Sequence, residues 1–168
     1  AADSIFVGAM AKALPVSTLN EKRAALRAIK AALKQLPLNQ ALEAVTRMAD
    51  SLNIPELPSD GDYRFMSWDQ ARQLHQAGFE IGAHTINHPI MSKISLHEAE
   101  QEILKSRDHI AAQLTGCSET FCYPNGKTGD YTPDIVSFVK QHFSSALATN
   151  RGHADVAELF ELRRLSPA

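Results

Sequence analysis

The chain has 168 residues, of which 44% are hydrophobic, and a formal net charge of −2 at pH 7. This length suits one domain, with or without an inserted helical segment, and the composition is ordinary for a protein with a packed core. The charge provides no overall basic field for nucleic acid or an anionic membrane, and no apolar run approaches the ~20 residues that span a bilayer. Two cysteines, Cys117 and Cys122, are too few for a disulfide framework. The apolar surroundings of Cys122 favour a small buried thiol over a zinc or redox role.

The first part of the chain predicts a short strand followed by two helices. Residues 1–8 read as the end of a strand that runs into a loop, which is not typical of a natural chain start. Thr18 and Glu21 have the spacing of a capping box, which opens a helix, and Pro37 ends it. A second helix follows, and two prolines, a glycine and two aspartates make residues 53–62 a loop. We therefore expect residues 1–62 to form the end of an early strand plus a helical insertion. The helical stripes are formed by Leu19, Leu26, Ile29, Leu33 and Leu36, then by Leu42, Val45, Met48 and Leu52.

From Phe65 onward the pattern alternates between helix and strand, which implies a parallel sheet or a barrel and hence an α/β fold. Residues 63–168 are the expected second part of the chain. Helices are predicted after the capping pairs Ser67/Gln70 and Ser95/Glu98 and at Thr132–Pro133, and strands at 79–83, 120–123, 144–148 and 159–165. The helix after Ser95 is expected to direct Leu96, Ala99, Ile103, Ile110 and Leu114 inward.

His84 and His88 are the first candidates for a chemical role, since two imidazoles four residues apart can bind one metal ion. Pro89 disfavours the helical conformation for the residue before it, so we expect the pair on a loop at the C-terminal end of strand 79–83. Catalytic residues of α/β barrels lie at that end of the strands. Two neutral imidazoles suit zinc, cobalt, nickel or iron, but a catalytic zinc usually has three protein ligands. The alternative for this bare spacing is one core histidine and one surface histidine.

Residues 82–89, Gly-Ala-His-Thr-Ile-Asn-His-Pro, resemble the His-Ser/Thr-x-x-His-Pro motif of polysaccharide deacetylases (carbohydrate esterase family four, the NodB-homology domain). Residues 66–82 are similar to that family's helix and strand before the motif. Residues 121–126, Phe-Cys-Tyr-Pro-Asn-Gly, resemble its next motif, and residues 162–165 resemble a late strand with an arginine. The resemblance covers about residues 63–168, with a weaker match at residues 1–8. It implies a partial or distorted (β/α) barrel of the polysaccharide deacetylase type with a helical insertion.

The resemblance also implies a hydrolase that acts on C–N amide bonds and removes N-acetyl groups from a polysaccharide. In that family's scheme His84 and His88 hold a divalent metal, zinc first and cobalt or nickel as alternatives, which acidifies a water and polarises the acetamide carbonyl. The backbone amide of Asn125, where most relatives have tyrosine, would stabilise the oxyanion. Thr85 and Asn87 would brace the loop, unless they only make local turn bonds, and Arg164 would support the site. The helical segment before Phe65 resembles an insertion in deacetylases of exopolysaccharide systems, so an exopolysaccharide is the expected substrate.

One motif of the family, Thr-Phe-Asp-Asp-Gly, is absent, and with it the third metal ligand and the catalytic base. Asp60 and Asp62 lack the apolar strand context, and Asp3, Asp50 and His153 match no motif of the family. We therefore expect an N-terminally truncated deacetylase that is inactive alone, with a missing N-terminal segment or a partner chain to complete it. The alternatives are a catalytically incomplete fragment, a non-catalytic glycan-binding or assembly module, and a protein-interaction hairpin formed by residues 10–53.

Overall fold

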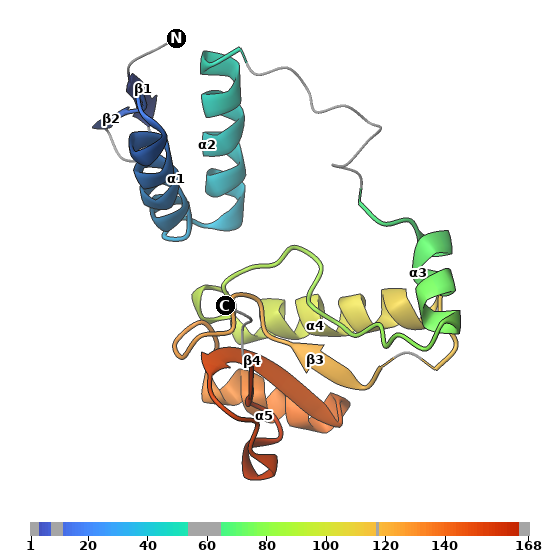
Figure 1. Ribbon diagram of the computed structural model, residues 1–168. Helices are drawn as coiled ribbons and strands as arrows, with labels where there is room; N and C mark the ends of the chain where they lie inside the picture. Colours follow the sequence, from blue (N-terminus) through green and yellow to red (C-terminus); the bar gives the residue numbers. More distant parts are fainter. Residues whose placement is uncertain (1–3, 8–11, 54–64, 117, 165–168) are drawn as a thin grey trace. The chain divides into compact units, whose positions relative to one another are not determined.

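The computed structural model of the chain describes residues 4–7, 12–53, 65–116 and 118–164. The chain divides into two compact units, Ala1–Arg64 and Phe65–Ala168 (Figure 1). Each unit has its own hydrophobic core, so each is described by itself.

The first unit is a β-hairpin followed by two helices. Strand β1 (Ser4–Val7) pairs antiparallel with β2 (Lys12–Pro15), and helices α1 (Leu19–Leu33) and α2 (Leu38–Ser51) follow. The predicted capping box opens α1, since the Glu21 amide donates to Thr18 Oγ1 at 3.2 Å and the Thr18 amide donates to Glu21 Oε2 at 2.8 Å. Strand β2 was not predicted, because four residues ending in proline give almost no alternating pattern.

The second unit contains a three-stranded parallel sheet, as the alternating pattern predicted. The strands are β3 (Thr120–Cys122), β4 (Ser145–Arg151) and β5 (Leu162–Arg164), in the order β3-β4-β5, and both pairings are parallel. Helices α3 (Trp68–Gln76), α4 (Leu96–Ala111) and α5 (Pro133–His142) begin at the three predicted caps, Ser67, Ser95 and Thr132. The crossover from β3 to β4 runs through α5 (Figure 1).

The core lies on one face of this sheet. Phe121 of β3 and Ala146 of β4 are fully buried there, in one cluster with Ile103 of α4 and Val139 of α5. Both helices therefore pack on the same face, while alternate strand residues such as Cys122 are only partly buried. Leu96 was predicted to face inward but is 43% exposed, because as the first residue of α4 it lies beyond the end of the core cluster.

The predicted strand at residues 79–83 is reduced to a single parallel bridge, Ala83 to Phe121. The segment still follows β3, since the Ser118 amide donates to the Ile81 carbonyl at 3.1 Å and the Cys122 amide to the Ala83 carbonyl at 3.0 Å. Among the described residues no strand pairs with its outer side. Gly82 permits the close approach, because a Cβ at this position would lie 2.7 Å from the Thr120 carbonyl oxygen.

Replacing Gly82 by alanine should therefore push this segment away from β3. We expect Gly82→Ala to lower the free energy of unfolding by about 1–3 kcal/mol, the usual cost of overpacking, measured by urea unfolding followed by circular dichroism. Gly116→Asn is the control, because Gly116 has a φ of +73° with open space around it and asparagine tolerates that conformation. Equal stability of Gly82→Ala and the parent would contradict the contact.

Candidate metal centre

The loop that contains His84 and His88 has an unusual backbone. Thr85 has a φ of 63° and His88 a φ of 53°, both in the left-handed region that residues other than glycine seldom adopt. The Thr85 hydroxyl accepts the His88 amide at 3.1 Å, which is a local turn bond. The absence of a helix at His88, expected from Pro89, is confirmed, although His88 is left-handed rather than extended. Two such residues in five mark a strained segment that its surroundings must hold.

Helix α4 holds this loop from one side. The Glu102 carboxylate accepts three hydrogen bonds, from the Ile86 amide at 2.9 Å, the Asn87 amide at 2.8 Å and the Asn87 side-chain nitrogen at 2.7 Å. One helical turn later, buried Ser106 accepts the His84 amide at 3.2 Å through its hydroxyl. The bonds of Asn87 therefore reach residue 102 and are not local turn bonds.

The two imidazoles lie next to each other, with ring centroids 4.8 Å apart and planes at 78°. Nδ1 of His84 is 2.8 Å from the Cys122 carbonyl oxygen. Since a carbonyl only accepts, Nδ1 must donate, and in the neutral ring Nε2 then keeps a lone pair for a metal. Two imidazoles on one tetrahedral ion, with bonds of about 2.0–2.1 Å, have centroids roughly 5 Å apart. The centroid separation is therefore compatible with one shared divalent ion.

A complete ligand set is not found in the part of the chain that the structure describes. No cluster of three or more histidine, cysteine, aspartate or glutamate residues able to hold an ion occurs there. Asp3, Asp60 and Asp62 lie outside the described residues. Asp50 belongs to α2 in the first unit, and His153 is an exposed residue of the second.

The turn after β3 is held by two hydrogen bonds from Thr149. Asn125 has a φ of 57°, and its carbonyl accepts the Thr149 hydroxyl at 2.5 Å. The Thr149 amide donates to the Gly126 carbonyl at 2.8 Å, and a Cβ on Gly126 would lie 2.9 Å from the Tyr123 carbonyl oxygen. Because Ala83 bridges Phe121 in parallel, Asn125 and His84 both follow the C-terminal ends of neighbouring segments.

Arg164 lies on the same side of the sheet as Cys122. Its Nε donates to the Ala148 carbonyl at 3.0 Å. Burial raises the pKa of the Cys122 thiol, and the charge of Arg164 opposes that rise. Cys122 therefore stays a thiol near neutral pH. The group of Cys122 that contacts the histidine pair is its backbone carbonyl, which accepts the hydrogen bond from His84 Nδ1.

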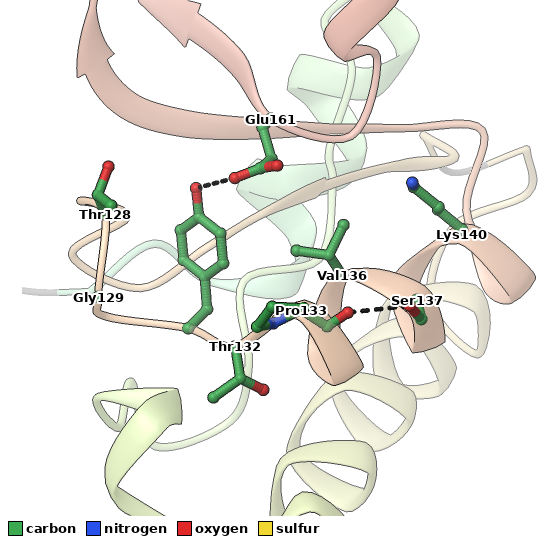
Figure 2. A pocket seen from close by; sticks show the side chains of 9 residues that line it. Thr128, Gly129, Thr132, Pro133, Val136, Ser137, Lys140 and Glu161 are labelled. Carbon is green, nitrogen blue, oxygen red and sulfur yellow. Dashed lines mark hydrogen bonds between the residues drawn. The ribbon is translucent and has the colours of Figure 1, made fainter.

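A hollow of about 500 Å³ lies beside α5, and neither His84 nor His88 lines it. The Tyr131 hydroxyl donates to Glu161 Oε1 at 2.9 Å, and the Tyr131 ring stacks on Tyr123 at 4.0 Å. Figure 2 shows Glu161 and Lys140 among the side chains that line this hollow. Burial raises the pKa of Tyr123, whose buried hydroxyl has no partner among the described residues. The hollow is lined by Thr128, Gly129, Tyr131, Thr132, Pro133, Val136, Ser137, Lys140 and Glu161.

Glu102 and Ser106 were not predicted from the sequence. An acidic residue on a helix is normally read as solvent-facing, but Glu102 lies between Ala99 and Ser106 on the buried stripe of α4. A carboxylate within an otherwise buried stripe is the signal that could have identified it, since charges in such places are nearly always paired.

Comparison with known proteins gives a consistent result. A family model for polysaccharide deacetylases matches residues 20–143. The Streptococcus pyogenes deacetylase PplD in complex with acetate is 25% identical, with a TM-score of 0.57 over 62% of this chain and 46% of that one. A Bacillus cereus polysaccharide deacetylase is 17% identical, with a TM-score of 0.53 over 73% of this chain and 42% of that one, which supports the fold alone. This chain thus spans less than half of either structure. No curated protein matches.

Removal of the Glu102 carboxylate should loosen the loop and weaken metal binding. We expect Glu102→Ala to lower the affinity for Zn²⁺ about 10–100-fold, the usual effect of losing a group that supports metal ligands, measured by isothermal titration. Glu100→Ala, on the same helix but absent from the contacts of the loop, should bind as the parent does. Equal losses in both variants would show that the effect comes from charge alone.

Proposed function

The chain belongs to the polysaccharide deacetylase family, and from this premise we propose that it forms part of a metal-dependent hydrolase that removes N-acetyl groups from a polysaccharide. The α/β fold, with a parallel sheet and the expected form of a partial barrel, agrees with the deacetylase structures that it matches. The observation that supports the metal dependence best is the histidine pair, whose centroid separation of 4.8 Å suits one ion.

The metal is held by His84 and His88 in this proposal. The family is generally metal-dependent, and zinc is the proposed ion, with cobalt or nickel as alternatives. When bound, the ion lowers the pKa of a water and polarises the acetamide carbonyl. The Cys122 carbonyl fixes the tautomer of His84, and Glu102, through Asn87, keeps the loop in its left-handed conformation.

The remaining roles are assigned to Asn125, Arg164 and Thr85. The backbone amide of Asn125 stabilises the oxyanion, in a turn that Thr149 holds rigid. Arg164 supports the site from β5 through its bond to β4, and Thr85 supports it through its bond to His88. In this proposal the third metal ligand and the catalytic base come from a missing N-terminal segment or from a partner chain.

The proposed substrate is an exopolysaccharide, on the basis of the helical segment α1–α2 before the deacetylase motifs. A second candidate function is a non-catalytic glycan-binding or assembly module. It is favoured by one observation, the absence of a three-ligand cluster among the described residues. The hydrolase should release acetate from the polysaccharide and should need a metal ion to do so. The non-catalytic module should release no acetate.

The histidine pair makes a direct prediction for metal binding. We expect Zn²⁺ to bind this chain in isothermal titration, and His84→Ala and His88→Ala to lose the binding, since each removes one of the ligands. His109→Ala is the matched control, because His109 is an exposed histidine of α4. Binding that is indifferent to His84 and His88 would refute the proposed metal site.

The catalytic role is tested in a longer protein that contains this chain. We expect acetate release from an N-acetylated exopolysaccharide that requires Zn²⁺ or Co²⁺ and falls to background after chelation. His84→Ala should also abolish it, while His109→Ala should not. Metal binding without acetate release from any N-acetylated glycan would favour the non-catalytic module.

A further inference from the structure

Helix α1 has an exposed face that combines cations with leucines. Six residues occupy positions i, i+3, i+4, i+7, i+8 and i+11, the spacing that places residues on one side of a helix: Leu19, Lys22, Arg23, Leu26, Arg27 and Lys30. All six are exposed, and the two leucines retain 63% and 51% of their accessible surface. We call these six residues the cationic face.

The opposite side of α1 is the one that packs. Ala25 is buried with Leu14 of β2, and Ile29 and Met48 of α2 pack against them. Within the first unit α1 and α2 lie side by side (Figure 1), so the cationic face points away from the unit's own core. Its leucines are therefore not accounted for by that core.

The cations of this face are not neutralised within the described part of the unit. Among residues 12–53 none of its four lysines and arginines forms an ion pair, whereas Arg47 of α2 pairs with Glu43 at 3.0 Å. The only acid in α1 is Glu21, and its carboxylate accepts the Thr18 amide in the capping box. The face is thus a local positive field on a chain whose net charge is −2.

We propose that the cationic face binds the surface of an anionic lipid bilayer. Lysines and arginines are attracted to anionic headgroups, and the attraction acts over about one Debye length, ~10 Å, so distant acids of the chain do not cancel it. The exposed leucines distinguish a bilayer from a soluble polyanion, because only a bilayer offers apolar material just below its charges. The 15-residue helix would lie flat on the surface. Among the described residues no helix is long and apolar enough to cross a membrane. The inference does not depend on the deacetylase activity.

The test is sedimentation of the full chain with sucrose-loaded vesicles of phosphatidylcholine, with and without phosphatidylglycerol. We expect binding only to the anionic vesicles, with a steep loss as salt is raised. Arg23→Glu with Arg27→Glu should weaken binding roughly tenfold or more, and Leu19→Ser with Leu26→Ser should weaken it several-fold without any change in charge. Lys105→Glu with Lys127→Glu is the control, since both lysines are exposed residues of the second unit and the net charge changes equally.

Three outcomes would overturn the proposal. Equal binding to neutral vesicles would exclude the electrostatic attraction, and an equal loss in the lysine control would show that only net charge matters. Unchanged binding of the leucine variant, together with full competition by dextran sulfate, would identify a soluble polyanion as the partner. Circular dichroism of each variant checks that α1 is still helical, and the salt dependence of the unmodified chain tests the attraction without any variant.

Discussion

The geometry of the histidine loop depends on the carboxylate of Glu102. Thr85 and His88 adopt the left-handed conformation. This conformation costs free energy for residues other than glycine, so surrounding contacts must stabilise it. Glu102 compensates by accepting the two consecutive amides at the tip of the loop and the side chain of Asn87. Hydrogen bonds to an ionised carboxylate are stronger than neutral ones, so one helical side chain can hold a strained turn. The same helix packs against the sheet through Ile103, which ties the loop to the core.

The parallel arrangement of the sheet explains why the candidate residues converge. In parallel strands the C-terminal ends lie at one edge, where open α/β sheets and barrels place their ligands. His84 follows the segment bridged to Phe121, Asn125 follows β3, and Arg164 ends β5. The sheet face with Cys122 is half-buried, while the opposite face is covered by helices. In a (β/α) barrel the first face would correspond to the inside and the second to the outside.

The features that could be predicted from the sequence are those set by neighbouring residues. The capping boxes at Thr18, Ser67 and Ser95 were correct because the bonds span three residues. Strand 79–83 was only partly correct, since a local pattern does not show how far a segment pairs with its neighbour. Glu102 was missed because its bonds reach a loop fifteen residues away. The histidine pair is a prediction from its motif, but the tautomer of His84 required the Cys122 carbonyl, which lies thirty-eight residues along the chain.

Because Glu102 and Ser106 stand one turn apart on α4, unwinding of that turn would release the loop at both of its anchors. We therefore expect loop and helix to open together rather than residue by residue. A ligand that binds only the closed loop would therefore also stabilise the helix against unwinding, by mass action. The stability of the middle of α4 would then depend on whether the proposed metal site is occupied, although α4 contributes no ligand to that site.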